Sequence, residues 1–547
     1  MISSPRAVEA GVGAAMAGTA RPRRRVPVGL AAAALVVCGL VGLPVVYLAF
    51  RAAGASEGSW DLILRSRTVW LALRTIGLAA AVTATAGAVG VAFAWLAVRS
   101  DLPYRKVWAV LYALPLVVPS YVGAFVLLAA LGPRGLVQGW LEPLGVERLP
   151  DIGGFPGAYL ALSLFTYPYV YLVSAAAIRG LDPSLEETAR TLGRPRWDVF
   201  RRVTLPLLRP AIAAGGLLVA LYTLHDFGAV SLMRFPTFTQ AIYLQYRAAF
   251  DRTPAAILSL MLVAIALAVV AAEQRFRGRA RYYRTGAGAI RDLPAVPLGR
   301  WRWGALVLSA AVVGLALALP VGVLLHLLVR GLDAGIPLNL TVGAAGNSVL
   351  VSAVGAVAAM LLALPIASLV ARYPGRRANG VERVAYAGYA LPGLVVALAF
   401  VFFAARYAPA VYQSLPLVIA AYVVLFLPQA AEPLKSGLQQ LSPRVEEAGR
   451  TLGRGPGAVF RRVVLPLLAR PAAAGMALVF LTAMKELPAT LLLRPTGFET
   501  LATRIWTSAS AGLYSRAAVP ALLIVLVSVI PLSALARRVG VEEIRGD

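Results

Sequence analysis

The chain has 547 residues, of which 59% are hydrophobic and only 14% are charged. A soluble globular protein carries about 25% charged residues, so this composition excludes a soluble protein and indicates one that crosses a membrane many times. The net charge of +27 comes almost entirely from arginine, which we assign to loops beside anionic lipid headgroups rather than to nucleic-acid binding.

A helix needs about 20 apolar residues to cross the hydrocarbon core of a bilayer, and twelve stretches of the chain meet this requirement. The first six are predicted at 26–50, 74–98, 107–131, 156–178, 207–232 and 254–273. The second six are predicted at 303–329, 345–371, 383–404, 414–433, 471–493 and 517–537. Prolines inside these stretches are expected as kinks that neighbouring helices tolerate. The predicted fold class is therefore an all-α membrane protein with about twelve transmembrane helices.

The distribution of arginine predicts the orientation. The RPRRR run at 21–25 precedes a stretch of about 25 apolar residues, which is longer than a signal-peptide core and is expected as the first span. Six spans then return the chain to the cytoplasm at an arginine-rich linker, as the positive-inside rule requires. Both chain termini are expected in the cytoplasm. The loop at 51–73 departs from the rule, because it holds three arginines on the outer side.

The two sets of spans are copies of one unit. Residues 181–206 and 441–466 are identical at 16 of 26 positions without a gap, and YALP at 112–115 matches YALP at 389–392. Six spans per unit leave both copies in the same orientation, which predicts parallel repeats with a pathway between them. The expected segments are a cytoplasmic N-terminal tail 1–25, a first repeat 26–273, a basic cytoplasmic linker 274–302, a second repeat 303–537 and a C-terminal tail 538–547.

A charged segment lies between the fourth and fifth spans of each repeat, hence on the cytoplasmic side. Asp182-Pro183 and Ser442-Pro443 predict the start of a short helix. Gly193 and Gly453 predict its end. Leu185, Ala189 and Leu192 recur at helical spacing, which gives a narrow face of small and apolar residues. A basic helix lying on lipid is the alternative, but the same pattern in both copies favours docking into paired grooves of a two-fold partner.

Each segment resembles the EAA loop of bacterial ABC importer permeases, which reads Glu-Ala-Ala, three residues, Gly, nine residues, an aliphatic residue, any residue and Leu-Pro. The first copy has Glu187-Thr188-Ala189, Gly193 and Val203-Thr204-Leu205-Pro206, and the second has Glu447-Ala448-Gly449, Gly453 and Val463-Val464-Leu465-Pro466. Thr188 and Gly449 replace the usual alanines. The resemblance covers residues 70–270 and 340–540.

The resemblance implies a type I ABC importer permease fold in a bacterial cytoplasmic (inner) membrane. It implies two copies of an ABC ATPase subunit and an extracytoplasmic substrate-binding protein as partners, besides the lipid bilayer. ATP and Mg would be bound by the ATPase, with no cofactor in this chain. The residues that it assigns to ATPase coupling are Glu187, Ala189, Gly193, Leu205, Pro206, Glu447, Ala448, Gly453, Leu465 and Pro466.

The stretch at 484–506 resembles the ferric-iron subset of these permeases, in which two repeats are fused in one chain. Ferric iron is therefore the expected substrate. Thiamine permeases share the fused layout, and sulfate and phosphonate also remain open. Outside the family, a twelve-span secondary transporter would need no docking loops, and a membrane enzyme or assembly scaffold should carry a catalytic constellation.

No sequence motif predicts an enzyme. GxxxxGK[ST] and HExxH are absent, and Cys38 is the only cysteine. Tyrosines at 165–172 are assigned to packing or to the membrane interface rather than to metal binding. Ionisable residues inside spans often mark a transport pathway. The pathway candidates are His225, Asp226, Lys485 and Glu486, in matching places of the fifth spans; the alternative is an internal ion pair that holds the helix against its neighbours.

Overall fold

The computed structural model describes residues 26–55, 60–61, 63, 65–248, 252–277, 295–336 and 339–541. The expected N-terminal tail 1–25, residues 542–547 of the expected C-terminal tail 538–547, and most of the expected linker lie outside these residues, whereas residues 538–541 belong to the last helix. The described residues form helices and one isolated β-bridge, between Ser100 and Val296. The all-helical class predicted from the sequence is confirmed.

The helices of the described residues fall into two sets, one for each repeat. In the first repeat they are α2 (Val28–Ala53), α4 (Ser66–Arg99), α5 (Arg105–Ala113), η1 (Leu114–Val117), α6 (Ser120–Leu131), α7 (Leu136–Leu141), η2 (Glu142–Leu144), α8 (Phe155–Arg179), α9 (Pro183–Thr191), α10 (Arg196–Val199), η3 (Phe200–Thr204), α11 (Leu205–His225), α12 (Gly228–Leu232), α13 (Phe238–Ala248) and α14 (Thr253–Arg277).

In the second repeat they are α15 (Trp301–Val313), η4 (Gly314–Ala318), α16 (Leu319–Asp333), α17 (Asn339–Arg372), α18 (Arg376–Tyr386), η5 (Ala387–Ala390), α19 (Gly393–Tyr407), η6 (Pro409–Val411), α20 (Leu415–Gln440), α21 (Pro443–Thr451), α22 (Pro456–Val459), η7 (Phe460–Val464), α23 (Leu465–Met484), α24 (Pro488–Leu493), α25 (Leu501–Ser510) and α26 (Tyr514–Val541).

Ten stretches of helix in the described residues are long and apolar enough to cross a membrane. An eleventh span is the pair Arg376–Ala390 and Gly393–Tyr407, which is bent by 103°. The described part of α26 adds a shorter apolar helix. Each of the twelve predicted stretches coincides with one of these elements, in the order that two six-span repeats require.

The third and fifth spans were predicted as continuous helices, and this prediction is wrong. The third span of the first repeat passes through the 3-10 turn η1 and an extended Val118 before α6 begins. Pro119 explains the break, because it lacks an N–H and forces Val118 out of the helical region. The fifth span ends at His225, where Asp226 is extended, and resumes as the short α12.

The structure also corrects one alignment of the repeats. Pro119 directly precedes α6 and Pro392 directly precedes α19, and each lies 20 residues after the arginine, Arg99 or Arg372, that ends the second span. Pro119 is therefore the counterpart of Pro392. The YALP match instead pairs Pro115 with Pro392, so it is four residues out of register and is a coincidence of sequence.

Small residues bring the helices of each repeat into close contact. A Cβ atom on Gly90 of α4 would lie 2.8 Å from the Tyr171 backbone nitrogen of α8, and one on Gly215 of α11 would lie 2.8 Å from the Val170 Cα. In the second repeat, a Cβ on Gly355 would lie 2.8 Å from the Tyr422 ring. Such close approach is how helices associate in lipid, where apolar burial gives little driving force.

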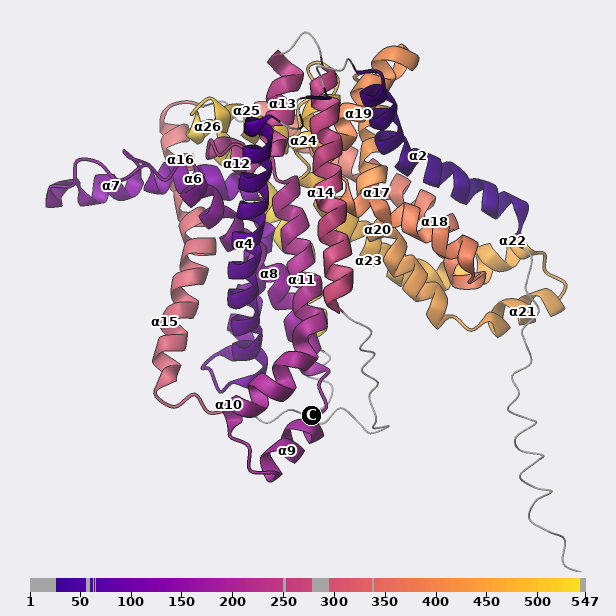
Figure 1. The fold of residues 1–547 in the computed structure, drawn as a ribbon, viewed down its shortest axis with the longest axis horizontal. Coiled ribbons are helices and arrows are strands. Elements are labelled where there is room, and N and C mark those ends of the chain that lie inside the picture. Colours follow the sequence, from indigo (N-terminus) through magenta and orange to yellow (C-terminus); the bar gives the residue numbers. More distant parts are fainter. Residues whose placement is uncertain are drawn as a thin grey trace, which may run out of the picture.

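The first helix of each repeat packs against the other repeat. Figure 1 shows the indigo α2 among the orange helices α17, α18 and α19, which it contacts. The Tyr47 hydroxyl of α2 donates a hydrogen bond to the Phe402 carbonyl of α19, 3.3 Å away. Conversely, α15 and α16 contact α5 and α6, and Ser309 of α15 shares a 2.6 Å hydrogen bond with Tyr112 of α5. The repeats are interlocked rather than side by side.

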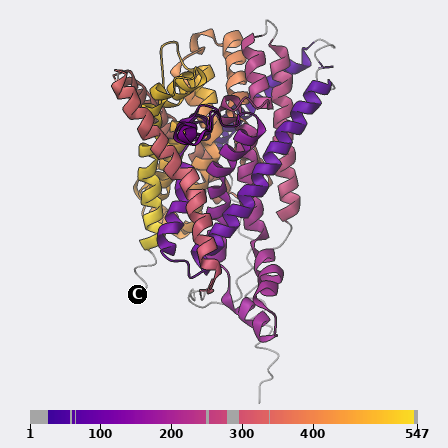
Figure 2. The same ribbon diagram turned by 90° about the vertical axis from the view of Figure 1, so that its left-hand side faces the viewer.

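Each charged segment lies beyond one end of a fifth span. The short helices α9 and α10 project below the long helices in Figure 1 and Figure 2. Their counterparts α21 and α22 lie at the right of Figure 1, beyond the end of α23 that is remote from α24, whereas α12 and α24 lie near the top. This arrangement places the repeated loops apart from the breaks in the fifth spans.

Candidate functional site

The repeated loops fold as the sequence predicts. The Asp182 carboxylate accepts a hydrogen bond from the Ser184 N–H at 3.0 Å and so caps α9, and the Ser442 hydroxyl accepts from the Arg444 N–H at 3.4 Å. Gly193 has φ +79° and Gly453 has φ +75°, one residue beyond the leucine that follows each helix. Left-handed backbone of this kind is the usual helix end at glycine.

The predicted small and apolar face divides into two faces. Leu192 and its counterpart Leu452 are 78% and 79% exposed, so they point away from the protein. Gly449 instead faces the second short helix, where an added Cβ would lie 3.0 Å from the Val459 side chain. The small residue at this place, Ala189 in the first loop, therefore serves the fold of the loop, whereas the leucines are left exposed.

The remaining predicted coupling residues join each loop to its span. Leu205-Pro206 and Leu465-Pro466 open α11 and α23 within continuous helix, because the residues before them, Thr204 and Val464, already have helical backbone. A π-helical turn precedes each of them, η3 or η7, with its paired arginines in the same register. Glu187, Glu447 and Ala448 lie on the exposed side of the first short helices.

Two ion pairs that the sequence analysis missed anchor the loops. Arg99, the last residue of α4, pairs with Glu186 of α9, and Arg372, the last residue of α17, pairs with Glu446 of α21, N···O 2.6 Å apart. The side chains are 7% and 16% exposed in the first pair and 15% and 16% in the second. We call these pairs the loop anchors. The signal of these pairs in the sequence was that both partners recur: Glu186 matches Glu446 in the repeated loops, and each arginine lies 20 residues before Pro119 or Pro392.

The pathway candidates gather where the fifth spans break. The buried Asp226 accepts hydrogen bonds from the N–H groups of Ala229 and Val230, at 2.9 and 3.2 Å, and from the Ser120 hydroxyl. Glu486 accepts one from the Ala489 N–H at 3.1 Å. Each carboxylate therefore caps the short helix that follows it, α12 or α24, and satisfies N–H groups that a helix start leaves open.

The basic member of each candidate pair reaches into the opposite repeat. Lys485 Nζ donates a hydrogen bond to the Leu116 carbonyl in η1, 3.1 Å away. The His225 ring lies against the backbone of Ala390 in η5. In the described part of the chain no ion pair joins any two of the four candidates. The structure instead brings His225 and Lys485 to the contact between the repeats.

Close packing continues this contact around the two bases. The Tyr121 hydroxyl donates to the Lys485 carbonyl at 3.5 Å. A Cβ on Gly228, in the first turn of α12, would lie 2.5 Å from the Tyr121 Cβ and 3.2 Å from a Leu487 methyl of the other repeat. The breaks in the third and fifth spans of both repeats therefore meet in one layer of the bundle, which we call the central contact.

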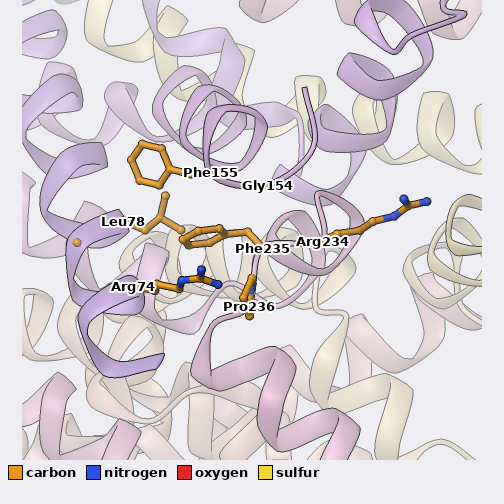
Figure 3. A pocket seen from close by; sticks show the side chains of 8 residues that line it. Arg74, Leu78, Gly154, Phe155, Arg234, Phe235 and Pro236 are labelled. Atoms are coloured by element: carbon orange, nitrogen blue, oxygen red, sulfur yellow. The ribbon is translucent and has the colours of Figure 1, made fainter. Parts of the chain in front are cut away.

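A cavity of about 470 Å³ lies elsewhere, toward the end of α4 that is remote from Arg99. Figure 3 shows the Arg74 guanidinium beside Phe235 and Pro236, with the Arg234 side chain extending away from them. The counterpart of Pro236 in the second repeat is Glu499, one residue before the threonine that precedes the next helix, and Arg504 binds its carboxylate at 3.0 Å. The repeats therefore differ at this place.

Both repeats of this chain are similar to known proteins. The profile of the family described as "Binding-protein-dependent transport system inner membrane component" matches residues 86–282 and 359–540. A protein of Haemophilus influenzae described as "Fe(3+)-transport system permease protein FbpB 2" is 33% identical over 510 residues, which is 92% of this chain and 96% of that protein. The "Molybdenum transport system permease protein ModB" of Escherichia coli K12 is 37% identical over 141 residues, or 25% of this chain and 58% of that protein.

One solved structure is also similar. It is the crystal structure of a bacterial ABC transporter involved in the import of the acidic polysaccharide alginate. The similarity covers 44% of this chain and 89% of the solved chain, at 18% sequence identity and a TM-score of 0.35.

Proposed function

Because this chain belongs to the family of binding-protein-dependent transport system inner membrane components, the permeases of ABC importers, we propose that it carries ferric iron across the membrane. The observation that carries the choice of iron is the 33% identity to a ferric-iron permease over 92% of the chain. The molybdenum permease is similar over only 25% of the chain. Sulfate is a weaker alternative, because two sulfate permeases are 27% identical over only 33% and 36% of the chain. Thiamine and phosphonate are weaker still, because only the layout or the loops favour them.

Radioactive uptake tests the substrate. We expect cells that express this chain with its own ATPase and binding protein to accumulate ⁵⁵Fe³⁺, and an excess of unlabelled molybdate, sulfate or thiamine to leave the rate unchanged. Cells in which the ATPase gene is deleted are the matched control. Competition by molybdate, or molybdate uptake in place of iron uptake, would assign the chain to the other substrate class.

Partner proteins are proposed to supply ATP hydrolysis and substrate capture. We propose that two copies of an ATPase subunit bind ATP and Mg and dock on the two loops, and that an extracytoplasmic binding protein delivers the substrate at the opposite end. This arrangement places the loops and both termini in the cytoplasm, in agreement with the basic residues near them. Two loops with the same fold favour two identical docking partners.

Within each loop the proposed coupling residues have different tasks. Leu192 and Leu452, together with the exposed Glu187 and Glu447, form the surface that enters the ATPase. Ala189, Gly193 and Gly453 hold the loop in shape, and the Leu-Pro pairs at 205–206 and 465–466 join it to the fifth span. Ala448 lies beside Glu447 on the exposed face.

The central contact is proposed as the gate of the pathway. Alternating access requires the repeats to move against each other, and Lys485 and His225 are the ionisable side chains that reach from the broken fifth spans into the opposite repeat. Asp226 and Glu486 hold the short helices that carry this layer. Opening would therefore break the hydrogen bond from Lys485 to Leu116 while the two caps stay intact.

A further inference from the structure

The loop anchors join each docking loop to a second place in the bundle. Along the chain, α9 continues through α10 and η3 directly into the fifth span, α11. The Arg99–Glu186 pair ties the same loop to the end of the second span, α4, which is 87 residues away in the sequence. In the second repeat Arg372 ties α21 to the end of α17 in the same way. Each loop therefore has one covalent and one ionic attachment.

We propose that the loop anchors transmit the movement of the ATPase to the second spans, so that the second and fifth spans of a repeat move together. This inference rests on the proposed docking of ATPase subunits at the loops. If the ionic attachment is removed, a displaced loop pulls on the fifth span alone. The central contact, which includes the third span of the opposite repeat, then receives only part of the movement.

The surroundings of the anchors fit a rigid link. Glu186 is held by two groups, because the Thr204 hydroxyl of η3 donates to its other oxygen at 2.8 Å. Arg372 also donates to the Leu441 carbonyl, at the start of the second loop, at 3.0 Å. In the first repeat these bonds fix the loop to the second and fifth spans. In the second repeat Val464 stands in the place of Thr204, and the additional bond reaches the end of the fourth span, α20 (Leu415–Gln440), instead. A pair that is shielded from water and bonded on several sides keeps its geometry, whereas an exposed pair gains little.

The same residues could instead serve only to fold the loop, and a charge exchange separates the two roles. The variants are Arg99→Glu, Glu186→Arg and the double variant with both changes, each in the complete complex with ATPase and binding protein. Two quantities are measured in proteoliposomes: ATPase subunits retained per chain, and ⁵⁵Fe³⁺ imported per ATP hydrolysed. The second ratio measures transmission, and a residue that only folds the loop would change the first.

We expect each single reversal to retain the ATPase and to lower iron imported per ATP at least about tenfold, because two like charges then face each other in a largely buried place. The double variant is expected to recover most of the loss, because the pair is restored in reverse. Glu186→Gln, which keeps the size of the side chain, is expected to give a smaller loss of the same kind. Arg372 and Glu446 should repeat the result.

Arg194→Glu is the matched control, because Arg194 lies in the same loop but its pair with Asp198, 3.4 Å apart, is exposed to water, with 55% of the Arg194 side chain accessible. We expect it to leave iron imported per ATP unchanged, because an exposed ion pair contributes little. The inference is overturned if the single reversals release the ATPase, whether or not the double variant restores it, or if they change neither quantity. Failure of the unmodified chain to retain any ATPase would instead contradict the proposed function.

Discussion

Replacement of Gly193 and Gly453 by valine tests whether the loops dock in the shape that the structure gives them. Both glycines have a left-handed backbone, with φ of +79° and +75°. A Cβ atom at either place would meet no other atom within 4 Å. Valine therefore causes no collision, and its entire effect comes from the backbone conformation that it disfavours.

The size of the effect follows from this conformational cost. A non-glycine residue pays about 1–2 kcal/mol in the left-handed region, and a β-branched residue is especially disfavoured there. If docking needs this shape, each loop should bind its ATPase subunit about 5-fold to 30-fold more weakly, since 1.4 kcal/mol is a factor of ten. The affinity of the ATPase for the chain in nanodiscs, measured by microscale thermophoresis, gives this ratio.

Two control variants make the prediction specific. Asparagine tolerates the left-handed region better than valine, so Gly193→Asn with Gly453→Asn should bind nearly as the unmodified chain does. Gly457→Val adds the same side chain to a helical glycine of the second loop, also in open space, and should change the affinity little. If the valine chain binds the ATPase as tightly as the glycine chain, or if asparagine and valine lower the affinity equally, docking does not need the left-handed backbone.

Three further changes test other parts of the mechanism. Leu192→Asp with Leu452→Asp should weaken ATPase binding at least about tenfold per loop, because each leucine would otherwise be buried in the partner; unchanged retention in pull-down from nanodiscs would exclude these leucines from the interface. Lys485→Met removes the hydrogen bond across the central contact and should raise the rate of ATP hydrolysis in the absence of binding protein. If this rate equals that of the unmodified chain, Lys485 is not part of the gate. Asp226→Asn keeps an oxygen that can cap α12 and should preserve iron uptake at matched protein level. Asp226→Ala removes the cap and should lower the free energy of unfolding by about 1 kcal/mol. Loss of uptake in the folded asparagine variant would show that the charge itself is needed.

The sequence predicts the features that depend on local chemistry. Asp182 before proline indicates a helix start and Gly193 indicates its end, and both predictions are confirmed because capping involves residues only a few positions apart. The twelve apolar stretches indicate the spans because the apolar length that a span needs is also contained within one short segment of the chain. The family follows from the spacing of residues within a loop, and its profile matches both repeats.

The features that the sequence did not predict depend on residues far apart or on how a span is interrupted. Glu186 looks like any acidic residue near a helix start, and nothing nearby shows that its partner is Arg99. Apolar composition does not distinguish a kinked helix from a broken one, so the break at Pro119 was missed. The YALP match shows how a short identity misleads, because the register of a repeat is set by packing rather than by four letters.

The contribution of the loops to transport can be measured directly in proteoliposomes that contain this chain and its ATPase, with binding protein and ⁵⁵Fe³⁺ outside and ATP inside. We predict iron accumulation that requires ATP, the binding protein and intact loops, and that falls to background when Leu192 and Leu452 are both replaced by aspartate. Iron accumulation driven by a proton or sodium gradient in vesicles without the ATPase would contradict the mechanism.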